Sequence, residues 1–466
     1  MTLPKLAVQQ LTAANQYIAN NFDELKATLI SLAKIPGIAW EAFDAGELER
    51  SAKEVARLFN DTGLFDFVDI RRSSASGKEG APAVVAKRAA KNGKPQILLY
   101  AHHDVQPPGD EKVWQSKPFE PVEINGRLFG RGAADDKAGV VTHLAAVRAL
   151  AEICGSDFDL GLTLFIEGEE EAGSPTFRNF LTENNDDLRA DVIIVADSGN
   201  WTVDVPALTT TLRGLVSQVI EVSTLDHALH SGMYGGAVPD AMLAMIKLLA
   251  TLHDERGNVA VKGLIEGKAS QLPYTADQLS TDAGLLPGVT QIGDGSILDR
   301  IWSKPAITVI GIDGQSVAMS SNTLLPSVKA KISLRIAPGE QPEQALAQLR
   351  DHLEANLPFG ARLTYGETEL GKPFSQAQGG WAKDLAEQAL GAAWGTKSVN
   401  IGIGGSIPFI ADLTEVFPKA QILVTGVEDP DSRAHSPNES VDLAMLQKAM
   451  VAEAIFLISG NAIPGQ

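Results

Sequence analysis

Histidine and acidic side chains follow three apolar runs of this sequence. They are His102 and Asp104 after "PQILLYA", Glu169, Glu170 and Glu171 within "FIEGEEEAGS", and Asp197 after "ADVIIVA". Crowded carboxylates repel one another, and partial burial makes their ionisation more costly still. Imidazoles and carboxylates are also the usual ligands of zinc. The glutamate run is therefore either a solvated acidic loop, which is the simpler interpretation, or part of a site that holds cations.

The segment "YAHHDVQPP" has the spacing of a supported metal ligand. Residues two apart in an extended chain share a face, so His102 and Asp104 can meet while His103 points the other way. Metal-bound histidines usually donate their second ring N–H to such a carboxylate. We expect His102 to be a ligand, Asp104 its orienting partner, and His103 a structural residue.

Other candidate ligands carry weak signals when each is taken alone. Asp135 and Asp136 in "GRGAADDKAG" stand at a helix start, where an N-cap pair is the simpler interpretation. Asp197 is equally explained as a turn acid. His435, in the loop "SRAHSPNES", would mean little in isolation.

Alternating apolar strands and amphipathic helices predict an α/β layer with a mostly parallel, buried sheet. We expect helices over residues 5–34 and 45–60, after Asp136 and from Val441 onward. Strands are expected at 81–88, 95–105, 160–168, 190–198 and 420–429. Ligands of such folds gather at the carboxyl ends of the strands, which is where the candidate side chains stand.

The pattern of apolar and polar residues changes near Thr211. The runs "TTTLRGLVSQVIEVS", "PAITVIGI" and "VKAKISLRIAP" alternate apolar and polar residues like half-exposed antiparallel strands. Helical patterns at 239–253 and 342–356 lie between them, with an irregular stretch from Glu255 to Ser296. We therefore expect an α+β domain at 212–372, inserted into one discontinuous domain formed by 1–211 and 373–466.

Composition excludes several classes of protein. The 466 residues carry a net charge of −19, which argues against binding nucleic acid or an anionic membrane surface. We find no secretory signal pattern at the N-terminus and expect no segment apolar enough to span a bilayer. The single cysteine, Cys154, rules out an internal disulfide framework, and we expect it to be inert packing in a cytoplasmic protein.

Taken together, the motifs resemble those of a known family. In order they are "HHD", "GRGAADDK", "EGEEEAGS", "VIIVADS", "LRG", "ALHSGMYGGAVPD", "GGSIP" and "AHSPNE". This series is similar to the di-zinc exopeptidases: carnosinases, bacterial cytosolic dipeptidases, glutamate carboxypeptidase and desuccinylases. The resemblance covers about residues 20 to 458 and is greatest to the dipeptidase and carnosinase branch. It implies a zinc-peptidase-like catalytic domain and an inserted lid and dimerisation domain.

The resemblance implies a two-metal site. Asp135 would bridge the ions, with His102 and Asp197 on the first metal and Glu171 and His435 on the second. Zinc suits this mixed set of nitrogen and oxygen ligands, and manganese or cobalt are alternatives. Glu170 would then be the general base, whereas Glu169 has no role and is expected to be solvated. The resemblance also implies a cis bond between Asp135 and Asp136.

Substrate-binding residues are implied in the same way. His230 matches a histidine that reaches the active site of a neighbouring subunit, which implies a homodimer. Arg335 matches an arginine that grips a substrate carboxylate, a task that suits a bidentate guanidinium. A surface histidine and an ordinary strand arginine remain the alternatives. The other implied contacts are Asn322, Thr323, Gly404, Gly405 and Ser406, although the spacing from Thr323 to Arg335 is one residue short of the carnosinase pattern.

The expected function is hydrolysis of dipeptides or short peptides next to a free C-terminal carboxylate. Carnosinase-like enzymes carry an acid just before "GGSIP", yet Ile403 stands there and cannot pair with an ammonium group. The alternative is therefore a deacylase of N-acyl amino acids. A metal-binding scaffold without activity is disfavoured because Glu170 and Glu171 are both present. Serine and cysteine nucleophiles and a P-loop lack their motifs.

Overall fold

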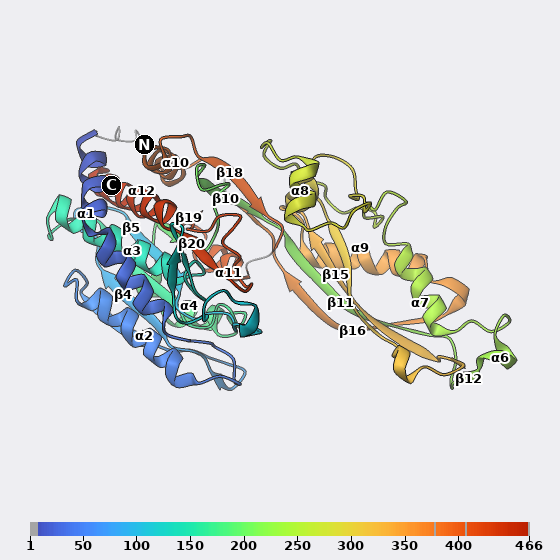
Figure 1. The fold of residues 1–466 in the computed structure, drawn as a ribbon. Helices are drawn as coiled ribbons and strands as arrows, with labels where there is room; N and C mark the ends of the chain where they lie inside the picture. The colour runs from blue at the N-terminus through green and yellow to red at the C-terminus, as the bar shows by residue number, and fades with distance from the viewer. Residues whose placement is uncertain (1–7, 377–378, 406–407, 465–466) are drawn as a thin grey trace. The chain divides into compact units, whose positions relative to one another are not determined.

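The computed structural model describes residues 8–376, 379–405 and 408–464, which divide into two compact units. The first unit comprises Met1–Thr210, Gln376–Ile401 and Asp412–Gln466. The second comprises Thr211–Ser375 and Gly402–Ala411. Figure 1 follows the chain through both units.

A mixed sheet forms the centre of the first unit, in the order β1-β4-β8-β5-β9-β19-β10. Its middle strands β8, β5, β9 and β19 are parallel, and β1, β4 and β10 pair antiparallel at the sides. Every residue of β8 is buried, as expected for a central strand that is covered on both faces. The strands are β1 Phe67–Arg71, β4 Ala83–Arg88, β5 Gln96–His102, β8 Gly161–Glu167, β9 Val192–Val195, β10 Ala207–Leu212 and β19 Gln421–Val424.

Helices cover this sheet and complete its core. The long ones are α1 Val8–Ala33, α2 Ala45–Asn60, α3 Lys137–Cys154, α10 Trp381–Trp394 and α12 Leu443–Ala462. α12 packs against α1, α3 and α10, so its apolar side chains are surrounded by other helices (Figure 1). The shorter elements are α4 Phe177–Glu183, α5 Asn185–Leu188, α11 Pro408–Val416, β2 Ser74–Ala75, β3 Lys78–Glu79, β6 Val122–Ile124, β7 Arg127–Phe129, β17 Phe374–Ser375, β18 Val399–Ile403 and β20 Ser440–Asp442.

Helix α12 corrects one expectation from the sequence. Its 20 residues are long and apolar enough to cross a membrane by length and composition. However, 83% of its most apolar window is buried inside the protein, as in the core helix of a globular domain. Asp442 caps its first turn by accepting the N–H of Met445, which explains why the helix begins there.

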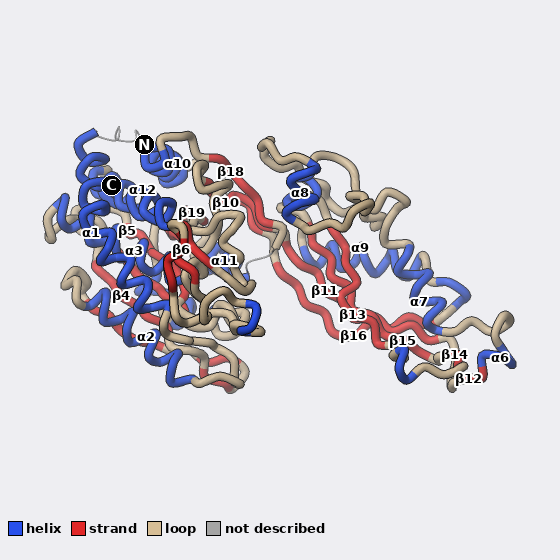
Figure 2. Tube along the Cα trace, viewed as in Figure 1, coloured by secondary structure: helices blue, strands red, loops and turns tan. Residues whose placement is uncertain are grey.

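The second unit is built on an antiparallel sheet in the order β13-β15-β11-β16. Its strands are β11 Gly214–Ser223, β13 Ala306–Asp313, β15 Ser327–Ile336 and β16 Arg362–Gly371. α7 Ala241–Ala250 and α9 Pro342–Ala355 pack against this sheet (Figure 2). β15 alternates buried and less buried side chains, which confirms the period seen in its sequence.

Two elements of this unit differ from expectation. Strand β16 was not predicted, because its residues "RLTYGETELG" are largely exposed and lack a clear apolar face. The stretch 255–296, expected to be irregular, contains α8 Ala276–Asp282, which begins with a capping box between Thr275 and Gln278. The remaining short elements are β12 Leu229–His230, β14 Thr323–Leu324 and α6 Ser231–Tyr234.

Candidate metal centre

Three parallel strands bring the candidate ligands to one edge of the first unit's sheet. β5 lies between β8 and β9, and His102 is its last residue. The glutamate run begins two residues after β8 ends, and Asp197 follows two residues after β9. The expected gathering at the carboxyl ends of the strands is therefore present.

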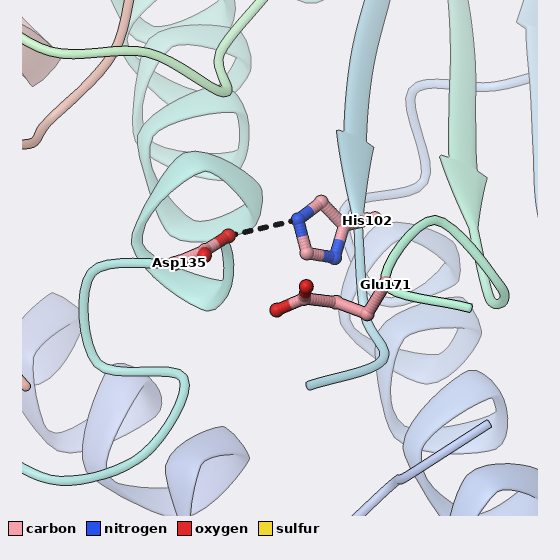
Figure 3. Close-up of side chains that lie close together, drawn as sticks. All are labelled: His102, Asp135 and Glu171. Carbon is pink, nitrogen blue, oxygen red and sulfur yellow. Dashed lines mark hydrogen bonds and ion pairs between the residues drawn. The ribbon is translucent and has the colours of Figure 1, made fainter. Parts of the chain in front are cut away.

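His102 is fully buried between two aspartates. Its Nε2 atom lies 3.0 Å from Oδ1 of Asp135, and its Nδ1 atom lies 3.3 Å from Oδ1 of Asp104. Figure 3 shows the ring of His102 facing Asp135, with Glu171 beside them. Nε2 is thus the nitrogen that faces the cluster, while Asp104 stands behind the ring, as the i, i+2 spacing predicted.

Asp135 directs its two oxygens toward two different histidines. Oδ1 faces His102, and Oδ2 lies 3.1 Å from Nε2 of His435. The same nitrogen of His435 lies 3.1 Å from Oε2 of Glu171. The side chain of His435 is 58% exposed, so it forms the solvent side of the cluster. The bond from Asp135 to Asp136 is cis, as the family resemblance implied.

Two overlapping groups of side chains offer ligand atoms within 4.8 Å of one another. One is His102, Asp135 and Glu171, and the other is His102, Glu170 and Asp197. Oε2 of Glu170 lies 4.0 Å from Nε2 of His102. The main-chain N–H of Gln106 donates to Oε1 of Glu171 at 3.1 Å, and its side-chain amide donates to Oε2 at 2.7 Å.

Asp104 also fixes the glutamate loop. Its Oδ1 accepts the N–H of Glu170 at 3.2 Å, and its Oδ2 accepts the N–H of Glu171 at 3.0 Å. A single buried carboxylate therefore orients both His102 and the two glutamates that follow β8. Asp104 acts through its neighbours, and its place behind the ring gives it a positioning task.

Glu169 differs from the expectation of a solvated residue. It is 7% exposed, and its carboxylate accepts the N–H and hydroxyl of Thr176 and the N–H of Ala81. These bonds satisfy a buried charge and shape the turn after β8. His103 meets its expectation of a structural role, because it is buried with Nε2 2.8 Å from the carbonyl of Pro82, and burial lowers its pKa to about 4.

The electrostatics of the cluster call for a cation. Burial raises the pKa of the Asp197 carboxyl to about 7. Burial, followed by the charge of Asp197, raises the pKa of Glu170 well above its usual range. Hydrogen bonds to Asp135 and Glu171 raise the pKa of His435 to about 11. Without a cation, protons must therefore offset the crowded negative charge.

The donor set fits a pair of divalent ions. It combines carboxylate oxygens with imidazole nitrogens, the mixture that zinc accepts. The five side chains of the expected ligand set carry three negative charges when both histidines are neutral, which nearly balances two divalent cations. The burial of His102, Asp135 and Glu171 keeps water from one side of the cluster, which strengthens such bonds.

Three candidate substrate residues lie together in the second unit. His230 pairs with Thr323 across the two-stranded sheet of β12 and β14, and the N–H of Ser231 donates to the carbonyl of Asn322 at 2.9 Å. His230 is exposed, and its ring accepts the N–H of Gly232 at 3.1 Å. The histidine and its two neighbours thus form one small exposed surface.

Arg335 and the glycines lie elsewhere in this unit. Arg335 is on β15, between its pairing partners Leu215 and Ala306. Nε of Arg213 donates to the carbonyl of Gly404 at 2.9 Å. A Cβ atom at position 404 would lie 2.5 Å from the carbonyl oxygen of Ile301, which explains the glycine. Gly405 follows directly, and Ser406 lies outside the described residues.

Two buried residues near the cluster were not identified from the sequence. Nζ of Lys137 donates to the carbonyls of Leu32 and Ile35 at the end of α1, and burial lowers its pKa to about 7. The carboxylate of Glu439 receives several N–H groups from the loop that carries Asp135. The motif "AHSPNE" contained Glu439, but no local signal separated it from an exposed loop acid.

Comparisons with known proteins find relatives over most of the chain. The model of peptidase family M20/M25/M40 matches residues 98–457. A cysteinylglycine-S-conjugate dipeptidase from Corynebacterium striatum is 35% identical over 88% of this chain and 90% of its own length. A beta-Ala-His dipeptidase from Rattus norvegicus is 27% identical, over 82% of each chain.

Solved structures show the same fold. The structure of the di-peptidase Dug1p from Saccharomyces cerevisiae superposes with a TM-score of 0.77 at 22% identity, covering 97% of this chain and 99% of that one. Human carnosine dipeptidase 1 superposes with a TM-score of 0.74 at 22% identity, covering 99% of this chain and 100% of that one.

Proposed function

Because the chain belongs to peptidase family M20/M25/M40, we propose that it is a metal-dependent dipeptidase, which hydrolyses dipeptides or short peptides next to a free C-terminal carboxylate. Two relatives over most of its length, from Corynebacterium striatum and Rattus norvegicus, bear the names of dipeptidases. Both relatives match over more than 80% of their own length, so the likeness covers most of each protein.

The observation that carries the proposal is the placement of Asp135. One of its oxygens lies 3.0 Å from His102, and the other lies 3.1 Å from His435. A carboxylate that faces two histidines with separate oxygens suits a ligand shared by two cations. The proposed ligand set is His102, Asp135, Glu171, Asp197 and His435, and zinc is the proposed metal.

Glu170 is the proposed general base. When bound, two divalent cations polarise the substrate carbonyl and lower the pKa of a water molecule toward neutrality. Glu170 would take a proton from the attacking water and later give it to the departing amine. Its side chain is 19% exposed, so it can reach both water and substrate.

The second unit supplies the proposed substrate contacts. Arg335 would bind the C-terminal carboxylate through paired N–H donors. Nδ1 of His230 accepts the N–H of Gly232, which leaves the proton of a neutral ring on Nε2. That N–H could stabilise an oxyanion. We assign Asn322, Thr323, Gly404, Gly405 and Ser406 to the same task of holding the substrate.

Exposed apolar side chains on the second unit support a homodimer. They are Met233, Tyr234, Leu243 and Ile246 on or beside α6 and α7, with Ile310, Ile312, Val317 and Met319 on and after β13. β13 is also an edge strand, which offers unpaired backbone groups to another chain. We therefore assign residues 212–372 to a lid and dimerisation domain. Residues 1–211 and 373–466 form the proposed catalytic domain. We also propose that the enzyme is cytoplasmic. If the wild-type protein sediments as a monomer, the proposed homodimer is wrong.

Ile403 favours one second candidate, a deacylase of N-acyl amino acids. Ile403 ends β18 and is half-buried, and its carbonyl accepts the N–H of Arg213 at 3.2 Å. An aliphatic side chain there gives an α-ammonium group no counter-charge, whereas it tolerates an acyl group.

A substrate panel separates the two candidates. Protein stripped by a chelator and reloaded with zinc, manganese or cobalt is given Ala-Ala-type dipeptides and N-acetyl amino acids in parallel. We expect turnover of the dipeptides, and Ile403→Asp should lower KM for them while leaving acylated compounds poor substrates. Turnover of the acylated compounds alone by the wild type would replace the dipeptidase proposal with the deacylase.

A further inference from the structure

The carboxylate of Glu439 is the meeting point of four N–H donors. Its Oε1 accepts the main-chain N–H of Ala134 at 2.9 Å and that of Asp135 at 3.1 Å. Its Oε2 accepts the N–H of Gly132 at 3.0 Å and Nη1 of Arg131 at 2.7 Å. Glu439 is fully buried, so these bonds replace all contact of its charge with water.

These bonds join the two loops that carry the proposed bridging ligand and the exposed histidine. One accepted N–H belongs to Asp135 itself, and Glu439 follows His435 by four residues. The carbonyl of Glu439 also accepts the N–H of Gly130 at 3.0 Å. A shift of Glu439 would therefore move Asp135 relative to His435.

Arg131 extends the connection to a third segment. It is 1% exposed, and Nη2 lies 3.4 Å from the carbonyl of Pro107 and 3.5 Å from that of Ser436. A buried ion pair gains little net stability, because the two charges lose their hydration. The benefit of placing Arg131 and Glu439 here is the fixed geometry of the loops that they connect.

The loop that carries His435 needs such support. Arg433, His435 and Asn438 have φ angles of 55°, 62° and 66°, a left-handed conformation that side-chain-bearing residues adopt at a cost. Hydrogen bonds from the surroundings must hold this backbone in place. The carboxylate of Glu439, at the end of the loop, accepts buried hydrogen bonds of this kind.

We propose that Glu439 is a positioning residue of the metal centre, which fixes Asp135 against His435 so that both meet the cations without rearrangement. The proposal rests on the proposed function only in assuming that Asp135 and His435 bind metal. Glu439 is not one of the proposed ligands and acts through the loops that carry them. Its loss should weaken metal binding, as loss of residues that orient ligands typically does by about 10- to 100-fold.

Glu439→Gln tests this directly. The amide keeps the volume, but it turns one acceptor into a donor that faces N–H groups. Zinc affinity is measured by competition with a chromophoric chelator, well below the unfolding temperature, and folding is checked by circular dichroism. We expect a loss of affinity of about 10- to 100-fold and, at saturating zinc, a fall in kcat with little change in KM.

Glu453→Gln is the matched control, because Glu453 is a buried glutamate of the same unit that pairs with His143 away from the ligands. It should lower the unfolding temperature and leave zinc affinity unchanged. Should Glu439→Gln not fold, Glu439→Asp keeps the charge on a shorter side chain that cannot reach all four donors. Wild-type zinc affinity in either folded variant would overturn the proposal, whereas a wild type that binds no divalent cation would overturn the proposed function as well.

Discussion

Oε2 of Glu170 lies 4.0 Å from Nε2 of His102, beyond hydrogen-bond distance, while Asp135 lies 3.0 Å from the same nitrogen. Glu170 is thus beside the cluster without pairing with its central histidine. It is also partly open to solvent, unlike Glu171, whose side chain is 1% exposed. The two adjacent glutamates therefore differ in access to water, and different tasks follow for them.

Replacing the proposed base should separate catalysis from metal binding. We expect Glu170→Gln to lower kcat by about 10²- to 10⁴-fold, because it removes proton transfer. Metal content, measured by elemental analysis, should stay at the wild-type value. Glu183→Gln, at an exposed position of α4, is the control and should match the wild type. Wild-type turnover by Glu170→Gln would remove Glu170 from the mechanism.

Removal of metal should destabilise the first unit. Ligands that bind only the folded state stabilise it by about 4 kcal/mol at a thousandfold excess over the dissociation constant. We expect a chelator to lower the unfolding temperature and added zinc to restore it, as followed by calorimetry. His435→Ala should show a smaller shift, because one of the proposed ligands is gone. An identical shift in both proteins would argue that the cation binds elsewhere.

Arg335→Lys should affect substrate binding more than turnover. Lysine keeps the charge but cannot make the paired bonds of a guanidinium. We expect KM to rise by about 10-fold, since a charge-assisted hydrogen bond contributes about 1.5 kcal/mol or more, while kcat stays within a few-fold. Arg350→Lys, on α9 of the same unit, is the control for replacing a guanidinium with an ammonium group. An unchanged KM would exclude Arg335 from the substrate site.

The buried pair of His143 and Glu453 should make stability depend on pH. Nδ1 of His143 lies 2.7 Å from Glu453, and Nε2 lies 3.0 Å from the carbonyl of Tyr100, so both nitrogens face acceptors. Burial lowers the pKa of His143, but the charge and hydrogen bond of Glu453 outweigh it and raise the pKa above its usual value. The stabilisation is therefore complete below the unfolded pKa of about 6.5 and is lost as pH rises through the folded pKa.

Urea unfolding of His143→Gln against the wild type measures this effect. We expect a cost of about 3–5 kcal/mol near pH 6, the usual result of breaking a buried ion pair. The difference should shrink steadily as the pH is raised. His227→Gln, at an exposed position, should show no such trend. A cost that is constant with pH would mean that the pKa of His143 does not differ between the folded and the unfolded protein.

Local patterns predicted the parts of the site that depend on a single segment. The apolar runs of β5, β8 and β9 identified the strands, and their order placed His102 and Asp197 at one edge. The i, i+2 spacing placed Asp104 behind His102. The pairing of Asp135 with His435 joins residues 300 apart in the sequence, so only the family resemblance indicated it.

Residues that depend on distant partners could not be predicted. Glu169 reads as a solvated acid, but it is buried because Thr176 and Ala81 supply donors. Glu439 was missed because its donors lie about 300 residues earlier. The apolar character of α12 was underestimated. The helices that enclose this segment come from distant parts of the chain, so its complete burial could not be predicted from its own residues.

The position of α12 sets an order of events during synthesis. The helix packs against α1 and α3, which begin about 430 and about 300 residues before it in the chain. The faces of α1 and α3 that α12 covers must wait for it throughout elongation, whereas the second unit, almost one continuous segment, can fold first. During synthesis, the second unit can thus be folded while the first unit is still incomplete. The need for chaperones should remain high until Leu443–Ala462 emerges from the ribosome.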